Sequence, residues 1–467
     1  MWLMGYDNQS GLPYGGTNID FLSGTANVYY QYRDMSFRMA NSNISDFNGN
    51  VQFYTNGYYI ANSSGDTMQN GTGLNPSQYT SWYPDGLSII QANLIIPMPN
   101  SANLYYLFHS TLDNLSNSTA LQLYYSLMDM SLNNGLGEVI LKNQVIISDQ
   151  LSAGKISACK HANGRDWWVT CHKANSNSIY KLLITPYAIL GPYIQNIGII
   201  KSSITGQVAY SQDGQKYAYY DHVHELEIFD FDRCTGIFSN STHIILGNNS
   251  EGGGVAFSPN SQVLYVPSIN YVYQFDVTAP NIAATQTIVA VWDTFYSPQP
   301  PFATYFYLAQ LAPDGKIYLV TGNSTQHLHV INQPDVLGMG CDLQQHSFVL
   351  PTLNFNTLPN HPNYFLGADS GSVCDTIVTT VDVFEPPEIQ IKTFPNPSNG
   401  IFTLGFPTQN EQGVLEIYDV LGNLILKENV AQWSQYKRVN IFEVSTGIYL
   451  CKISWGEKNA NVKILKE

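Results

Sequence analysis

Two pairs of histidines have the spacing that best suits metal binding. His222 and His224 are separated by one residue, and so are His327 and His329. Side chains at positions i and i+2 of a β-strand share a face, so each pair could offer two imidazole ligands to one zinc ion. The sequence identifies no third ligand. We therefore interpret all four as polar residues of strands or strand ends, and we predict no metal site and no cofactor.

Acid–base catalysis on glycans would need two carboxyl groups facing each other across the bond that breaks. Acidic residues are frequent in one segment, but the sequence does not place two of them across a cleft: Asp221, Glu225, Asp230 and Asp232. The segment 211–217 is similar to the Asp box of sialidases, but Gly214 follows Asp213 directly, as in a tight turn. The chain has no G-x-S-x-G motif. We assign no catalytic residue.

Aromatic side chains offer non-covalent chemistry, because their apolar faces can stack on sugar rings. The segment 298–301 contains three prolines and indicates a long loop between strands, where binding residues often lie. We expect Trp167 or Trp168 to be buried, since both belong to an apolar strand pattern. The candidates for an aromatic platform are Trp167, Trp168, Trp292, Tyr296, Tyr305 and Tyr307.

The six cysteines form no C-x-x-C motif, which argues against zinc-ribbon and thioredoxin-type sites. Cys159 and Cys171 flank an expected hairpin, and we predict that they can pair. Cys341 and Cys374 flank the last segment before an expected linker and are the second predicted pair. Buried free thiols are the alternative for each of these cysteines.

The composition narrows the classes of protein to consider. Only 12% of the 467 residues are charged, whereas soluble proteins average about 25%. Aromatics make up 13%, so the chain is not disordered by composition. With 20 basic against 35 acidic residues, it is unsuited to neutralising nucleic-acid phosphates. No apolar stretch reaches the roughly 20 residues of a membrane-spanning helix. We expect an all-β protein that works outside the cytoplasm.

One unit recurs along the first 380 residues: a small polar turn followed by an aromatic-rich strand. Asn-Gly and Asp-Gly tolerate the positive φ that tight hairpins need. Three units resemble the turn of WD-type propeller repeats, as in Ala-Phe-Ser-Pro-Asn-Ser at 256–261. The intervals of about 47 to 61 residues match four-stranded propeller blades. The units lie at 48–54, 102–108, 163–169, 213–219, 260–266, 314–320 and, more weakly, 361–366.

These units predict a seven-bladed WD-like β-propeller, with six or eight blades and a chain of β-sandwiches as alternatives. Residues 392–467 do not follow the repeat but alternate apolar and polar residues, which predicts a small Ig-like β-sandwich. They carry a net charge of +1, against −16 for residues 1–391. We therefore predict a propeller at 1–384, a linker at 385–391 around Glu-Pro-Pro-Glu, and the sandwich at 392–467.

The tail contains three short blocks: Phe-Pro-Asn-Pro-Ser-Asn-Gly at 394–400, Ile-Tyr-Asp-Val-Leu-Gly at 417–422 and Thr-Gly-Ile-Tyr-Leu at 446–450, followed by a short basic end. In these blocks and their order, the tail resembles the type A C-terminal sorting domain of the Bacteroidota type IX secretion system. The residues that carry the motif are Pro395, Asn396, Pro397, Gly400, Tyr418, Asp419, Gly422, Gly447, Tyr449, Lys463 and Lys466.

This resemblance implies export by a signal peptide and then through the outer membrane. The expected partners are the type IX secretion machinery and its sortase-like peptidase, and the expected location is the cell surface or the medium. Residues 1–5 show no signal peptide, so we expect the record to begin after it or without it. Residues 1–380 resemble, more loosely, secreted Bacteroidota proteins in which a propeller precedes such a domain, as in Lys-His-Ala-Asn-Gly-Arg-Asp-Trp-Trp at 160–168.

The sequence therefore favours a secreted propeller that binds extracellular glycans or proteins without catalysis. The alternative is a propeller enzyme, a hydrolase or lyase, acting on extracellular glycans. A cluster of carboxylates at a mouth of the central channel would favour the enzyme, whereas aromatic and amide side chains would favour the binding module.

Overall fold

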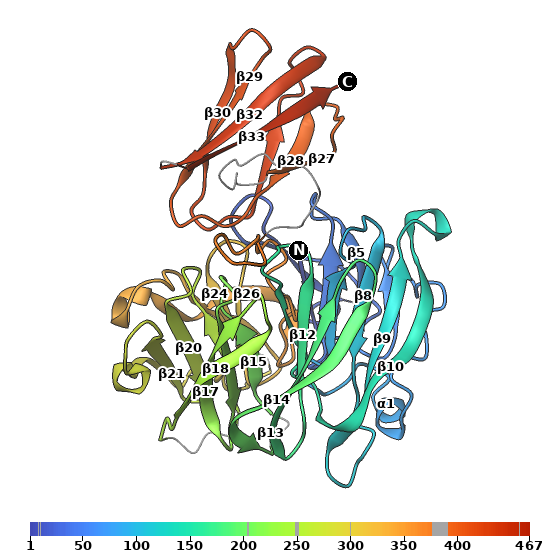
Figure 1. The fold of residues 1–467 in the computed structure, drawn as a ribbon, viewed down its shortest axis with the longest axis vertical. Coiled ribbons are helices and arrows are strands. Elements are labelled where there is room, and N and C mark those ends of the chain that lie inside the picture. Colours follow the sequence, from blue (N-terminus) through green and yellow to red (C-terminus); the bar gives the residue numbers. More distant parts are fainter. Residues whose placement is uncertain are drawn as a thin grey trace.

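The computed structural model describes residues 1–7, 9, 11–202, 205–247, 252–298, 300–375, 391–456 and 458–467. Strands dominate in these ranges, and the helical elements found there are the single turn α1 (Gln78–Trp82) and three 3₁₀ turns, η1 (Asn133–Gly135), η2 (Ile282–Thr285) and η3 (Gly338–Cys341). No helix in the described ranges is long and apolar enough to cross a bilayer. Figure 1 shows a large β-domain with a smaller one at one end.

The large domain contains seven antiparallel sheets in the described residues, and strands adjacent in sequence pair in order. The first three sheets are β1 (Trp2–Met4), β2 (Thr17–Asp20), β3 (Asn27–Tyr30); β4 (Ser42–Ser45), β5 (Val51–Thr55), β6 (Ile60–Asn62); and β7 (Asn93–Pro97), β8 (Leu104–His109), β9 (Thr119–Asp129), β10 (Glu138–Ser152). This order of strands, repeated from sheet to sheet, is that of propeller blades.

The remaining four sheets have four strands each. They are β11 (Ser157–Lys160), β12 (Trp167–His172), β13 (Ser176–Ile184), β14 (Ile189–Lys201); β15 (Gln207–Tyr210), β16 (Lys216–Asp221), β17 (Glu225–Asp232), β18 (Ile237–Ile244); β19 (Ala256–Phe257), β20 (Val263–Ser268), β21 (Tyr271–Asp276), β22 (Thr287–Val291); and β23 (Phe306–Leu311), β24 (Ile317–Thr321), β25 (Thr325–Ile331), β26 (Leu343–Asn354).

Seven clusters of buried apolar side chains lie between neighbouring sheets and close them into a ring. The cluster that closes the ring joins the seventh sheet to the first, where the ring centroids of Trp2 and Tyr318 are 5.7 Å apart. The second strands are buried on both faces, as in β12 and β20, whereas the outer strand β14 is largely exposed. The predicted seven-bladed propeller is confirmed.

The predicted turns join the first and second strands of blades 2 to 7. In the turn at 46–50, the Asp46 carboxylate accepts backbone N–H groups of Asn48 and Asn50, and Gly49 has φ of +77°. The inner strands of these blades run in one direction, so their turns gather at one end. We call this end, with turns 46–50, 98–103, 163–166, 211–215, 258–262 and 312–315, the turn face. The opposite end, with α1 and the loop at 292–305, is the far face.

The weak seventh unit at 361–366 was assigned wrongly, because it does not begin a blade. The blade that completes the ring is formed by β1–β3 at the other end of the sequence. Residues 355–366, which we call the axial segment, instead run among the inner strands of the ring. The repeat pattern requires only a polar turn followed by apolar residues. A segment whose backbone bonds to other blades, rather than to a following strand, can have the same pattern.

The axial segment is held by amide side chains that join different blades. Asn360 donates to the carbonyls of Asn93 and Ile156, at 2.8 and 2.9 Å, and so joins blades 3 and 4. Gln91 bonds both Val208 of blade 5 and Asn360. These contacts satisfy buried backbone groups that would otherwise face an empty channel, which is costly in a protein interior.

The smaller domain is a sandwich of two antiparallel sheets around one core, as predicted. Residues 385–390 of the expected linker lie outside the described residues. One sheet orders its strands β27-β28-β31 and the other β30-β29-β32-β33. The strands are β27 (Lys392–Phe394), β28 (Ile401–Gly405), β29 (Gly413–Tyr418), β30 (Leu424–Val430), β31 (Tyr436–Asn440), β32 (Gly447–Trp455) and β33 (Lys458–Lys466).

Candidate functional site

The central channel, where many propellers bind ligands, is filled by the protein's own chain. The axial segment leaves a cavity of about 50 Å³, far below the roughly 300 Å³ of a small-molecule site. Among the described residues that line it are Gln91, Gln310, Asn360, Asn363 and His361, and none carries a carboxylate. This cavity has no room for a sugar.

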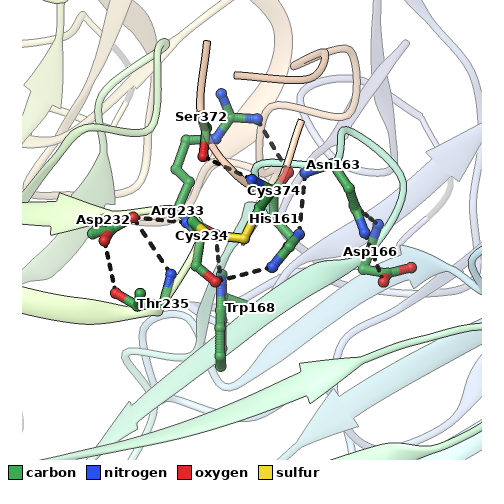
Figure 2. The surroundings of a disulfide bond; sticks show 10 residues. All are labelled: His161, Asn163, Asp166, Trp168, Asp232, Arg233, Cys234, Thr235, Ser372 and Cys374. Carbon is green, nitrogen blue, oxygen red and sulfur yellow. Dashed lines mark hydrogen bonds between the residues drawn. A yellow bond between two sulfur atoms is a disulfide. The ribbon is translucent and has the colours of Figure 1, made fainter. Parts of the chain in front are cut away.

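A disulfide between Cys234 and Cys374 ties the chain that follows the axial segment to blade 5 (Figure 2). His161 joins the same cluster: its Nδ1 accepts the N–H of Asn163, so its Nε2 donates to the carbonyl of Cys234, at 3.0 Å. The Trp168 indole donates to the carbonyl of Arg233, at 2.9 Å. The 140 residues between the two cysteines make this a long-range clamp.

Both predicted cysteine pairings are therefore wrong. Cys159 and Cys171 are free, because the register pairs Cys159 with Trp168, which sets Cys171 on the opposite face of the sheet. Each thiol packs in a different inter-blade core, and burial raises the pKa of both to about 12. Cys341 is buried at the end of η3 and is also free, while Cys374 has Cys234 as its partner.

The two histidine pairs have structural roles. The described residues contain no cluster of three or more metal-ligating side chains. His222 and His224 lie in the turn between β16 and β17, where the Asp221 carboxylate accepts the backbone N–H of His224 at 2.7 Å. His327 and His329 do share a face of β25, as the spacing predicts. His329 is fully buried, and burial lowers its pKa to about 3.

The four clustered carboxylates are also engaged locally. Asp230 forms an ion pair with Lys216 at 2.8 Å, and Glu225 accepts the N–H of Leu246. Asp232 caps its own turn by accepting N–H groups of Cys234 and Thr235, and Asp221 is fully buried in the turn described above. Each carboxylate thus has its own local role rather than a partner across a cleft.

Three of the predicted aromatic residues do come together on the loop between blades 6 and 7. The ring of Trp292 lies 4.4 Å from that of Tyr305 and 5.7 Å from that of Tyr296, between centroids. Trp292 and Tyr305 are half-buried, and Tyr296 is 52% exposed. Trp167 and Trp168 are buried, as expected. We call Trp292, Tyr296 and Tyr305 the aromatic cluster.

Contacts with blade 7 hold the loop that carries the aromatic cluster. Phe295 stacks on His346 with 4.0 Å between ring centroids, and His346 Nε2 lies 2.8 Å from the Asp293 carboxylate. Gln345 of β26 bonds the start of this loop twice, accepting from the N–H of Asp293 and donating to the carbonyl of Val291. The sequence identified the aromatic residues but not these supports, because His346 comes from a strand some 50 residues later.

The first and last blocks of the tail motif meet in space and close the sandwich. Asn396 bonds β33 twice, donating to the carbonyl of Lys463 and accepting the N–H of Leu465, both at 2.8 Å. Gly400 has φ of +97°, and a Cβ there would meet Lys466 at 2.5 Å. The other motif residues occupy turns or strand ends of the sandwich: Pro395, Pro397, Tyr418, Asp419, Gly422, Gly447 and Tyr449.

Residues 392–467 match the family model of the secretion system C-terminal sorting domain. The C-terminal sandwich is a sorting domain. Domains of this family mark proteins for export by the type IX system to the cell surface or the extracellular space, so the secretion machinery is a partner of this chain.

The sorting domain packs on the turn face of the propeller (Figure 1). Phe47, in the turn at 46–50, stacks on Phe394 with 4.3 Å between centroids and an angle of 9°. Phe365, at the end of the axial segment, lies 5.1 Å from Tyr436 of β31. Gly405 leaves room for the Phe47 ring, because a Cβ there would lie 3.1 Å from it.

No curated protein matches the sequence at a significant level. Solved structures similar to it include a candidate 6-phosphogluconolactonase from Bacteroides uniformis, with 13% identity, a TM-score of 0.45, and 75% of this chain and 97% of the other covered. Another is the Cps50 (Swd1) β-propeller domain of Myceliophthora thermophila, with 10% identity, a TM-score of 0.38, and coverage of 63% and 83%. Both scores fall below 0.5, and we base no functional assignment on them.

Proposed function

We propose that the exported propeller is a non-catalytic binding module for extracellular glycans. The observation that carries the proposal is the aromatic cluster. Trp292, Tyr296 and Tyr305 are held together on a well-supported loop, with part of their apolar surface exposed. Aromatic residues with an apolar body and a polar edge suit hydroxyl-rich rings, which present both kinds of surface.

The position of the aromatic cluster supports this function. The loop joins the outer strand of blade 6 to the inner strand of blade 7, so it lies on the far face. The sorting domain packs on the turn face, so a ligand can reach the cluster in the full chain. Connecting loops on a rigid scaffold are where binding residues concentrate. The engaged carboxylates of blade 5 lend no support to the alternative of a glycan hydrolase or lyase.

Binding of the full chain to an array of neutral and acidic oligosaccharides tests the proposal. We expect a defined set of glycans to bind, and Trp292→Ala to weaken that binding at least about ten-fold, a loss of about 1.4 kcal/mol. Tyr187→Ala is the matched control, because Tyr187 is 90% exposed on blade 4. The absence of glycan binding, or equal affinity of the Trp292→Ala variant, would overturn the proposal.

A further inference from the structure

Arg38 lies close to two aromatic rings at the far face. Its guanidinium carbon is 5.2 Å from the ring centre of Tyr83 and 5.6 Å from that of Phe355, both within cation–π range. The rings are themselves supported, since Tyr79 packs on Tyr83 at 4.6 Å and Tyr6 on Phe355 at 5.1 Å. The guanidinium thus lies beside two rings that are each packed against a further aromatic residue.

Three separate segments build this arrangement. Arg38 belongs to the link between blades 1 and 2, and its neighbours Met39 and Ala40 both donate to the carbonyl of Leu87. Tyr83 ends α1, which Figure 1 places at the end of the propeller away from the sorting domain. Phe355 is the first residue of the axial segment. The position of Arg38 therefore depends on the closed ring.

Arg38 differs from the other arginines of the propeller in its hydrogen bonds. Arg33 donates to the carbonyl of Met4 at 2.8 Å, Arg165 pairs with Asp166, and Arg233 donates to backbone carbonyls of several segments. For Arg38, the described residues provide neither an ion pair nor a hydrogen-bond acceptor, and its Nε is buried without a partner.

An arginine in contact with aromatic rings still presents its N–H groups in the plane of the guanidinium. That planar fork matches a carboxylate, which can accept two parallel hydrogen bonds. Arg38 is half-buried and its Nε is buried, so its two Nη groups are the donors that remain for a ligand. The neighbouring Trp82 is 55% exposed and adds aromatic surface to the same end of α1. A carboxylate on a ring-shaped ligand fits both features.

We propose that Arg38, beside Tyr83 and Phe355, binds the carboxylate of an acidic glycan, a uronic-acid sugar, at the far face. The inference rests on the proposed glycan-binding function and names the substrate class. Residues 1–391 carry a net charge of −16, so an anionic glycan meets repulsion from the propeller as a whole. Recognition must then come from a local, well-placed cation such as this one.

The test compares two forms of one ligand by calorimetry on the full chain: an oligogalacturonate and its uncharged methyl ester. We expect the acid to bind at least about ten-fold more tightly than the ester. Arg38→Gln should remove that preference, whereas Arg38→Lys should restore part of it, since a lysine keeps the charge but lacks the fork. Arg438→Gln is the matched control, because Arg438 is exposed on the sorting domain.

Equal affinity for acid and ester in the unmodified protein would overturn the inference, and that comparison needs no variant to fold. An Arg38→Gln variant that keeps the preference would overturn it as well. In either case, neutral glycans that bind through Trp292 would leave the proposed function standing. A chain that binds no glycan at all would remove both proposals.

Discussion

Single buried histidines make the stability of this fold depend on pH. His109 is fully buried in β8, where its two ring nitrogens bond the Asn75 and Ser126 side chains at 2.8 and 2.9 Å. Burial lowers its pKa from 6.5 to about 3. The neutral imidazole satisfies both neighbours, so a proton can be added only at the cost of burying a charge.

This burial predicts acid sensitivity. Between pH 6.5 and about 3 the unfolded chain holds a proton at His109 that the folded chain lacks, so the free energy of unfolding falls as the pH falls. The full contribution is roughly 5 kcal/mol at most. In His109→Gln, the slope of chemical-denaturation stability against pH over this window should be smaller than in the unmodified protein. An unchanged slope would contradict the assignment.

Spacing along the sequence could identify residues but not their partners. It placed His327 and His329 on one face of a strand, and it selected Trp292, Tyr296 and Tyr305 before their proximity was known. It paired the wrong cysteines, because side chains alternate between the two faces of a strand and two cysteines close in sequence can therefore lie on opposite faces. Arg38 carried no signal at all, since its two aromatic neighbours come from segments about 45 and 317 residues away.

At the scale of elements, the disulfide between Cys234 and Cys374 ties the chain that follows the axial segment to blade 5. Because the bond closes a 140-residue loop, its loss should destabilise the propeller by about 2–4 kcal/mol. In the double variant Cys234→Ser, Cys374→Ser we expect a lower melting temperature and faster amide exchange at residues 367–375. The backbone bond from Asp369 N–H to the Ala162 carbonyl marks the region to follow.

A reductant separates this effect from side effects of the substitutions. It should lower the melting temperature of the unmodified protein and leave that of the double variant unchanged, because the other four cysteines are already free thiols. Equal sensitivity of both proteins would show that the disulfide does not support the segment.

A second prediction at this scale concerns the contact between the sorting domain and the turn face. Gly405→Leu places a side chain against the Phe47 ring, while the backbone of β28 needs no left-handed conformation there. We expect the distance between spin labels on the two domains to change from a narrow to a broad distribution. Leu421→Ala, on a residue 84% exposed in the sorting domain, should leave it narrow. A broad distribution in the unmodified protein would mean that the domains are not docked.

For the whole molecule, export depends on the sorting domain. Deleting residues 392–467 should abolish delivery to the cell surface and the medium while the propeller stays folded, because the inter-blade clusters that close the ring contain no residue of that segment. Fractionation of cells followed by immunoblotting measures the location, and circular dichroism of the purified truncated chain measures the fold. Normal export of the truncated chain would contradict the assignment.

The sequence by itself determined the propeller class, the repeats of blades 2 to 7, the separate tail and its sorting motif. These follow from local rules, because turn residues and alternating strands act over a few positions. Only the tertiary structure decided which segment completes the ring, that the chain fills its own channel, and which cysteine Cys374 bonds. It also placed the sorting domain on the turn face and Arg38 beside Tyr83 and Phe355. These features join segments distant in the chain, and their contacts exist only once the ring has closed.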